Sequence, residues 1–543
     1  MRSFGALLLL AFALLPAVAA AGPAPDPAPA RALLQGDEPS ELVAEFRRFY
    51  GKAKTATERY EAVQVLKEVD SLEAAQALLA AFEDEDFNVR RAAVDVVGSF
   101  KTPDTAHWLV DGVLLDKKMA PRKQVRGLAA EALGRMKQDF SYWPLLALLD
   151  EKDPGLKLAG VAALGSLGNP DACPKLSVLA TGTDGGLAVA ALDALARIGN
   201  GPGAEAAVLA ALTHADWRVR ARAIEASVQL RLKSSIGPLI ERLRVEDGRL
   251  AGDAYQALKV ITLRDFLDRP DDWADWWKSA EPVFQLPDYA KIAAARAAAE
   301  KNGTRYTAAK KQFLGMETRS ESILFVIDVS GSMETPFSDP ERLKALGRTY
   351  RSMQRLEIVK EELIHTVQDL PESTSFNIMA FARDQMPWKK DTVKANVLNK
   401  SSAADWISKL RPLGGEKAAY RERLGFGPGQ QANSPLSSSS SDEGATNTYG
   451  ALMVALGEKP DEKGTGDYVT APSRSHLDTI FFLTDGEPTA GKSVDMFEIR
   501  REVQRVNAYR GIQIHVIYVG EYQGEEFEKL AHDNNGIFTA IGG

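Results

Sequence analysis

The chain has 543 residues, a net charge of −8, 45% hydrophobic residues and 26% charged residues. A chain of this length is expected to hold more than one domain, and its composition is that of a globular protein. The negative charge argues against general nucleic-acid binding, which needs a basic surface.

The first 21 residues have the pattern of a secretory signal peptide. Arg2 supplies the positive charge, Ala6 to Leu15 form a short apolar stretch, and small residues such as Ala19 and Ala21 suit cleavage. The apolar stretch is short for a membrane span, which leaves an uncleaved anchor as the alternative. No other long apolar stretch follows. The sequence therefore predicts an exported chain without a transmembrane segment after cleavage, located in the periplasm or outside the cell.

Residues 22–40 are rich in Pro and Ala and are predicted to be an extended, semi-rigid linker. The single cysteine, Cys173, excludes an intramolecular disulfide. Because Cys173 stands where a turn leads into a predicted helix, it is interpreted as a buried structural thiol rather than a reactive one.

Residues 41–280 are rich in Ala and Leu, have helical periodicity, and repeat. Six similar segments begin at positions 89, 125, 156, 187, 219 and 250, so their spacings are 36, 31, 31, 32 and 31 residues. A fixed period in this range is typical of a solenoid. Each unit is predicted as a helix, a turn and a second helix, with Ala-rich faces that let helices stack closely. The fold class predicted for this part is all-α.

Two of these units carry the pattern D-x-x-V-R-x-x-A, from Asp86 to Ala93 and from Asp216 to Ala223. On this pattern, most of residues 55–262 resemble short HEAT repeats, and a unit near Thr55 is predicted to cap the N-terminal end. The repeated Arg residues are interpreted as structural rather than as a ligand site. A solenoid presents a long surface, so this part predicts protein–protein scaffolding.

Trp273, Trp276 and Trp277 follow the last repeat. Aromatic residues are common in binding hot spots, but this position favours a cap over the apolar end of the solenoid. Residues 281–321 are predicted to connect two domains, with a short helix at 293–301 and an edge segment at 313–320.

From residue 322 to residue 543, predicted strands and helices alternate. The strands are expected at 323–328, 375–382, 479–485, 512–519 and 537–541, and the helices at 355–369, 404–410, 449–456, 494–509 and 525–533. This alternation indicates a doubly wound, Rossmann-like α/β domain, with a mostly parallel sheet between two layers of helices.

Oxygen-bearing side chains follow two of these strands. Asp328, Ser330 and Ser332 come directly after one apolar run, Asp485 ends another, and Thr446 precedes a helix. Open α/β sheets bind ligands at the carboxyl ends of their strands, and oxygen ligands suit Mg²⁺. For the first segment taken alone, an ordinary Ser/Gly turn is the alternative.

Taken together and in this order, the segments D-x-S-x-S, Gly-Ala-Thr-Asn and Thr-Asp-Gly resemble the von Willebrand factor type A domain. In that family the three segments converge on a metal-ion-dependent adhesion site. The resemblance implies that Mg²⁺ or Mn²⁺ is held by Asp328, Ser330, Ser332, Thr446 and Asp485. It also implies that the hydroxyls bind directly or nearly so, that the aspartates often act through water, and that an acidic residue of a protein partner completes the site. Many members have Gly where this chain has Ala445, and Ala is small enough to fit.

These features predict a non-enzymatic, metal-dependent adhesion or scaffold protein of a bacterial exported type. Its partners are proteins, and no nucleic acid is expected. A metal-dependent hydrolase is an alternative, since a bound metal can activate water. The three segments have no His nearby to act as a general base.

A further alternative, an NTPase, rests on Gly486–Ser493. This segment matches the P-loop pattern G-x-x-x-x-G-K-[ST] between a strand and a helix. Against it, Glu487 places a carboxylate where phosphates would lie, and Pro488 removes one amide donor. The strand predicted at 512–519 also lacks an Asp at its end for a second Mg²⁺ contact.

Residues 414–444 look like an insertion beside the metal site. Two interpretations stay open: a segment that gates or selects the partner, and a Ser-rich disordered linker.

Overall fold

The computed structural model describes the chain in eight ranges, namely 39–288, 290–292, 311–314, 316–337, 350–414, 444–458, 477–520 and 524–541. The predicted signal peptide, nearly all of the linker at 22–40, the helix at 293–301 and most of the insertion at 414–444 lie outside the described residues. The described chain forms two compact units, 39–239 and 240–541. The boundaries proposed from the sequence, at 41–280, 281–321 and 322–543, stay predictions.

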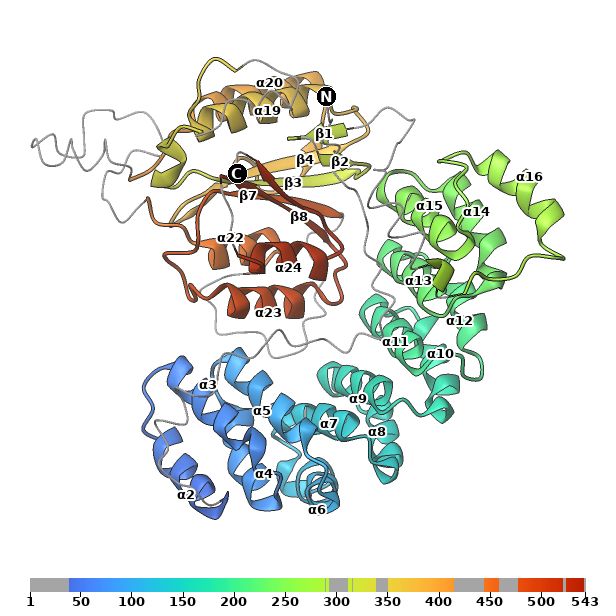
Figure 1. Cartoon of the computed structure of the whole chain (residues 1–543), viewed down its shortest axis with the longest axis vertical. Helices are drawn as coiled ribbons and strands as arrows, with labels where there is room; N and C mark the ends of the chain where they lie inside the picture. The colour runs from blue at the N-terminus through green and yellow to red at the C-terminus, as the bar shows by residue number, and fades with distance from the viewer. Residues whose placement is uncertain are drawn as a thin grey trace, which may run out of the picture. The chain divides into compact units, whose positions relative to one another are not determined.

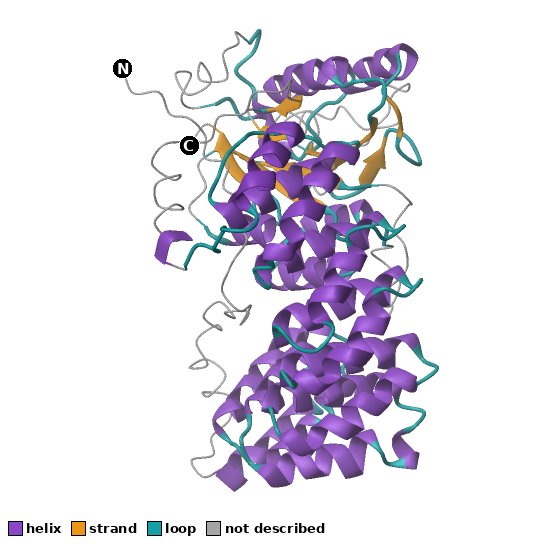
Figure 2. Cartoon of the chain, turned by 90° about the vertical axis from the view of Figure 1, so that its right-hand side faces the viewer, coloured by secondary structure: helices purple, strands orange, loops and turns teal. Residues whose placement is uncertain are grey.

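The N-terminal unit is built from helices in pairs, drawn in purple in Figure 2. Its helices are α2 (Pro39–Tyr50), α3 (Ala56–Val65), α4 (Leu72–Leu78), α5 (Phe87–Ser99), α6 (Pro103–Trp108), α7 (Lys123–Met136), α8 (Tyr142–Ala147), α9 (Pro154–Leu167), α10 (Cys173–Ala180), α11 (Gly185–Ile198), α12 (Ala204–Ala211) and α13 (Trp217–Gln229). Five of the six segments found in the sequence start at the third residue of α5, α7, α9, α11 and α13, and the sixth starts at the third residue of α15 (Gly248–Thr262) in the C-terminal unit. The predicted all-α repeat of helix pairs is therefore confirmed.

Four of the repeats begin their second helix with the same chemistry, whereas α7 follows Arg122 and has no side-chain cap. Asp86, Asp153, Asp184 and Asp216 precede α5, α9, α11 and α13, and each carboxylate accepts hydrogen bonds from backbone amides of the first turn. Such caps satisfy donors that have no partner inside the helix. The Arg of the repeat pattern acts nearby: Arg90 donates to the carbonyl of Asp84 over 2.8 Å, and Arg220 to that of His214 over 2.8 Å. These contacts give the Arg residues the predicted structural role.

Small residues let the second helices of neighbouring repeats approach closely. A Cβ added to Gly134 of α7 would lie 2.7 Å from the Cα of Ala163 in α9, and one added to Gly165 would lie 2.9 Å from the Cα of Ala194 in α11. Any side chain at these two positions would push the helices apart. Cys173 is fully buried, as predicted, and burial raises the pKa of its thiol.

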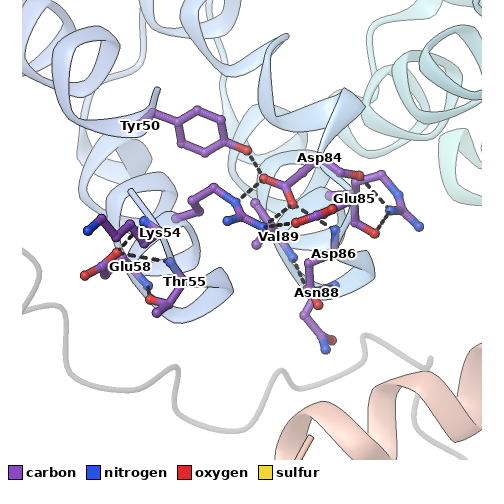
Figure 3. Close-up of polar contacts among 11 residues, drawn as sticks. Tyr50, Lys54, Thr55, Glu58, Asp84, Glu85, Asp86, Asn88 and Val89 are labelled. Atoms are coloured by element: carbon purple, nitrogen blue, oxygen red, sulfur yellow. Dashed lines mark hydrogen bonds and ion pairs between the residues drawn. The ribbon is translucent and has the colours of Figure 1, made fainter. Parts of the chain in front are cut away.

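A buried carboxylate holds the N-terminal end of the repeats together. Figure 3 shows the hydroxyl of Tyr50, at the end of α2, directed at Asp84. Arg59 of α3 donates to both oxygens of Asp84, over 2.7 and 3.0 Å, and the amide of Asp86 donates over 2.8 Å. Burial by itself would raise the pKa of Asp84, but the hydrogen bonds from Arg59 and Tyr50 hold this pKa below its usual value.

The C-terminal unit contains a seven-stranded sheet in the order β5-β4-β3-β7-β8-β9, with β6 also paired to β4. Its strands are β3 (Ser322–Asp328), β4 (Ser375–Phe381), β5 (Gln385–Pro387), β6 (Val393–Lys394), β7 (Thr479–Thr484), β8 (Gln513–Val519) and β9 (Phe538–Ile541). The five long strands are parallel, whereas β5 and β6 run antiparallel to β4. The predicted mostly parallel sheet is confirmed.

Helices cover both faces of this sheet, as Figure 1 shows. One face packs against α19 (Arg355–Asp369) and α20 (Val397–Ser408), and the other against α22 (Thr448–Ala455), α23 (Met496–Asn507) and α24 (Glu526–Asp533). The strands are buried on both faces because their apolar side chains alternate between two cores. Phe325 and Ile327 belong to one core, and Leu324 and Val326 to the other.

Three local predictions differ from the structure. The helix predicted at 404–410 starts earlier, at Val397. The segment predicted as an edge at 313–320 does not join the main sheet; instead β1 (Lys311–Phe313) and β2 (Met316–Thr318) form a separate antiparallel pair. The two short strands β5 and β6 were not predicted, because runs of two and three residues carry no usable alternation.

The amino-terminal end of the sheet is closed by polar contacts inside the C-terminal unit. Arg249 of α15 is buried and donates to the carbonyls of Asp478, over 3.1 Å, and Gly511, which precede β7 and β8. The Asp478 carboxylate accepts hydrogen bonds from Ser320 and from the amides of Glu321 and Ser322. These contacts fix the starts of three neighbouring strands.

The tryptophans after the last repeat lie in α16 (Pro270–Ala280). Trp273 and Trp277 are buried, and Trp273 donates to the carbonyl of Leu267 over 2.8 Å. Their rings pack among Phe266, Trp276 and Phe284. The burial favours the predicted packing role over ligand binding. Within the described ranges, no helix has the length and apolar character needed to cross a membrane.

We expect Asp84→Asn to loosen the N-terminal repeats. The amide would remove the buried charged partner of Arg59 and leave only the exposed Glu85, 3.6 Å away. This change should lower the stability of this end by about 2–3 kcal/mol. Faster amide hydrogen exchange in α2 and α3 is the measurement. Glu85→Gln is the control, because the Glu85 side chain is 83% exposed and should matter little. Equal exchange in Asp84→Asn and in the wild type would contradict this account.

Candidate metal site

The site lies where the chain changes direction in the sheet. From β3 the chain goes first to β4 on one side and later to β7 on the other. Such a switch point opens a crevice at the carboxyl ends of parallel strands. In the register of β3 and β7, Ile327 lies opposite Leu483. Asp328 is therefore level with Thr484, and Asp485 follows directly.

The structure brings the three predicted segments together at this point. The hydroxyls of Ser330 and Ser332 lie 3.0 Å apart, and Ser332 donates to Oδ1 of Asp485 over 2.6 Å. A Cβ added to Gly486 would lie 3.7 Å from the hydroxyl of Ser332 and 3.9 Å from that of Thr446. Ser330, Thr446 and both aspartates are buried, whereas Ser332 is exposed. The group thus has one side open to solvent.

Asp328 is held by hydrogen bonds to both of its oxygens. Oδ1 accepts from the amide of Ser330 over 2.8 Å, and Oδ2 accepts from the hydroxyl of Thr484 over 2.6 Å. Thr484 was not among the predicted site residues, although it stands in the Thr-Asp-Gly segment. With both oxygens engaged, the Asp328 carboxylate is held in a fixed orientation beside the loop that carries Ser330 and Ser332.

The end of β4 fixes the first two segments by backbone hydrogen bonds. The amide of Val329 donates to the carbonyl of Phe381 over 2.8 Å, and the amide of Asn447 donates to that of Ala382 over 2.9 Å. The amide of Leu413 in turn donates to the carbonyl of Val329 over 2.8 Å. The loops that carry the hydroxyls are therefore tied to the central sheet.

The loop after β7 braces Thr446. The amides of Thr489 and Ala490 donate to the carbonyl of Thr446 over 2.9 and 3.2 Å, and the amide of Thr446 donates to the hydroxyl of Thr489 over 2.8 Å. A P-loop needs free amides to hold phosphates. Here two of them are engaged, and the Lys492 ammonium lies 5.5 Å above the ring of Tyr449. These contacts argue against the nucleotide-binding alternative.

Arg355 joins the site from the start of α19 and was not predicted. Its Nη1 donates to Oδ2 of Asp485 over 2.8 Å, and the Asp485 side chain is fully buried. No local motif marks this residue, because the contact joins positions 130 residues apart.

The electrostatics of the site favour a cation. Burial and, to a smaller extent, the nearby charge of Asp485 raise the pKa of Asp328 to about 7. Burial also raises the pKa of Asp485, although hydrogen bonds from Ser332 and Arg355 oppose the shift. Two carboxylates that repel one another in a buried position would gain from a divalent ion between them.

The donor set is suited to a hard cation. It consists of oxygens, three of them neutral hydroxyls. Across the described ranges, no group of three or more His, Cys, Asp and Glu side chains is placed to hold a metal. A metal bound by these residues would therefore depend on the hydroxyls and the two aspartates. That the five residues are ligands stays a prediction.

His515, in β8, is part of the packing of the sheet. It is buried, its Nδ1 accepts from the amide of Ile537 over 3.1 Å, and its ring stacks on Phe481 at 4.8 Å. Burial lowers its pKa to about 3, so the imidazole is neutral at pH 7.

Family models match both parts of the chain. The model for HEAT repeats matches residues 52–119, 113–187 and 176–259, and the model for the von Willebrand factor type A domain matches residues 321–421 and 429–539.

Curated proteins similar to the chain include two heavy chains. Inter alpha-trypsin inhibitor heavy chain 4 of Mus musculus is 24% identical over 229 residues, which make up 42% of this chain and 18% of that protein. Inter-alpha-trypsin inhibitor heavy chain H1 of Mesocricetus auratus is 26% identical over 192 residues, or 35% of this chain and 15% of that protein. The chain thus spans less than a fifth of the length of these relatives.

Two of the solved structures that are similar to this chain each cover less than half of it. One is a von Willebrand factor type A protein from Catenulispora acidiphila, with 17% identity and a TM-score of 0.26, covering 41% of this chain and 39% of that one. Another is the complex of CpcE and CpcF of phycocyanin lyase from Nostoc, with 20% identity and a TM-score of 0.26, covering 45% of this chain and 94% of that one.

We expect the full chain to show no saturable binding of ATP in the presence of Mg²⁺, because the loop amides of Thr489 and Ala490 are engaged. Isothermal titration of ATP into the wild type and Lys492→Ala would measure this. Saturable binding that Lys492→Ala removes would restore the nucleotide-binding interpretation.

We expect Thr484→Val to weaken Mn²⁺ binding roughly tenfold, because residues that orient a ligand matter at this scale. Titration calorimetry on the full chain is the measurement. Thr479→Val is the matched control, since Thr479 lies buried at the opposite end of the same strand. If both variants bind Mn²⁺ as the wild type does, Thr484 does not orient the site.

Proposed function

The chain carries HEAT repeats in its N-terminal part and a von Willebrand factor type A domain in its C-terminal part, and we propose that it is a non-enzymatic binding protein that captures protein partners through a divalent metal. One observation supports this most directly. Two buried carboxylates and three hydroxyls, supplied by three separate segments, meet at the carboxyl end of the sheet beside an opening to solvent.

Each residue of the site has a proposed task. Ser330, Ser332 and Thr446 would hold the ion through their hydroxyl oxygens. Asp328 and Asp485 would supply the charge and orient the hydroxyls, as Asp485 already does by accepting from Ser332 over 2.6 Å. A bound Mg²⁺ or Mn²⁺ would offer one open coordination position to a carboxylate of the partner.

The buried hydrogen bonds support binding rather than turnover. The Asp328 carboxylate is fixed by the amide of Ser330 and the hydroxyl of Thr484. His515, on β8, is neutral and occupied in packing. The distant similarity to the heavy chains supports a role in protein interaction as well.

The HEAT repeats would supply a second surface for protein partners, so that one chain bridges two proteins. We further propose that the chain works after export, in the periplasm or outside the cell, on the strength of the signal-peptide pattern in residues 1–21.

We expect the full chain to bind Mn²⁺ and Mg²⁺ at one saturable site, and Asp328→Ala to lose that binding by a factor of at least about 100, because an orienting carboxylate and half of the acidic charge are removed. Titration calorimetry measures both affinities. Asp405→Ala is the control, as Asp405 is an exposed residue of α20 that pairs with the exposed Lys409. A wild type with no saturable site would overturn the proposed metal dependence.

The same proteins test partner capture. A peptide array in which each Asp and Glu is matched by Asn and Gln would be probed with the full chain in Mg²⁺ and again in EDTA. Binding should require Mg²⁺, a carboxylate in the peptide and an intact Asp328. Capture that persists equally in EDTA and in Asp328→Ala would show that partners bind elsewhere.

A further inference from the structure

The metal site contains a cation of its own. Arg355 is the first residue of α19, and its Nη1 lies 2.8 Å from Oδ2 of Asp485. The Asp485 carboxylate is fully buried, whereas 20% of the Arg355 side chain is exposed to solvent. The guanidinium thus shares the carboxylate that the proposed ion would also use.

Two backbone hydrogen bonds hold the start of α19 in this position. Its amide donates to the carbonyl of Thr335 over 3.1 Å, and the amide of Phe337 donates to the carbonyl of Met353 over 2.8 Å. The start of α19 is therefore tied to the loop that carries Ser330 and Ser332.

Gly520, at the end of β8, makes room for the guanidinium. A Cβ on Gly520 would lie 3.1 Å from Nη2 of Arg355, and the φ of Gly520 is +131°, which other residues rarely adopt. Nε of Arg355 is buried and has no acceptor among the described residues. A buried donor without a partner is unfavourable, so the position of Arg355 is maintained in spite of this local penalty.

The net charge of the site depends on Arg355. Asp328 and Asp485 contribute two negative charges, and Arg355 contributes one positive charge. The three hydroxyls are neutral. With a divalent ion added, the set carries one surplus positive charge; without Arg355, the same set would be neutral.

We propose that Arg355 competes with the divalent ion for Asp485 and supplies the surplus positive charge that attracts a carboxylate of the partner. This inference rests on the proposed metal-dependent binding. It makes Arg355 a residue that lowers the affinity for the ion and raises the affinity of the loaded site for an anion. The metal and the acidic partner would then strengthen one another's binding.

A purely structural role for Arg355 predicts the opposite change in the affinity for the ion when Arg355 is removed. If Arg355 only held Asp485 in place, its removal would disorder the carboxylate and weaken the binding of the ion. The two roles are therefore separated by the direction of a single change in affinity.

The test uses the full chain as wild type, Arg355→Gln, Arg355→Lys and Arg500→Gln. Arg355→Gln keeps a hydrogen-bond donor and removes the charge, and Arg355→Lys keeps the charge. Arg500→Gln removes a positive charge from α23, where Arg500 pairs with Glu526 and Asp533. Titration calorimetry gives the Kd for Mn²⁺, and circular dichroism checks that each variant is folded. Water-proton relaxation of the Mn²⁺ complex, titrated with acetate, reports how readily a carboxylate displaces the bound water.

We expect Arg355→Gln to bind Mn²⁺ at least tenfold more tightly and to need at least fivefold more acetate for half-displacement. Arg355→Lys and Arg500→Gln should stay within threefold of the wild type in both measurements.

Mn²⁺ binding by Arg355→Gln that is equal to or weaker than that of the wild type would overturn the proposed role of Arg355 alone. An unchanged acetate response would do the same. Absence of Mn²⁺ binding in the wild type and in all variants would overturn the proposed function together with this inference. Mn²⁺ binding that is measurable in Arg355→Gln but not in the wild type would support the competition between Arg355 and the ion, and it would still overturn the proposed metal dependence of the wild type.

Discussion

Two carboxylates buried side by side, Asp328 and Asp485, are the constraint on which the architecture of the C-terminal domain depends. A buried ionised carboxylate is unfavourable unless it is hydrogen-bonded or paired with a charge. The parallel register of β3 and β7 forces both groups to the same end of the sheet. Thr484, Ser332 and Arg355 satisfy their oxygens, each from a different part of the chain. The loops that surround the site follow from this need, because each must deliver a donor to a fixed position.

The two ends of the sheet solve similar electrostatic problems in different ways. At the amino-terminal end, Arg249 donates to two backbone carbonyls, and Asp478 accepts from two backbone amides and the Ser320 hydroxyl. At the carboxyl-terminal end, the groups are satisfied mainly by side chains, and Ser332 stays exposed. Side-chain partners at the second end can exchange for a ligand without unfolding a strand.

Much of the domain follows from the sequence because its central elements are long and strongly patterned. Helix α19 lies where it was predicted, and the five parallel strands differ from prediction by one residue at most at each end. Helix α20 was harder, because its first residues, Val397 and Leu398, are exposed apolar side chains that break the helical pattern of burial.

The same distinction applies to the site. The five predicted residues lie in segments with a recognisable order of residue types. Arg355 and Thr489 lie in no such segment. Arg355 contacts Asp485 across 130 positions of the chain, and Thr489 contacts Thr446 across 43 positions.

The match of Gly486–Ser493 to the P-loop pattern has another structural cause. Gly491 has a φ of +110° and lies against the side chain of Asn447, and the amides of the loop hold Thr446. Gly486 faces the hydroxyls of Ser332 and Thr446, where a side chain would enter the opening of the site. The glycines thus serve the frame of the proposed metal site, and the loop needs no phosphate to account for its sequence.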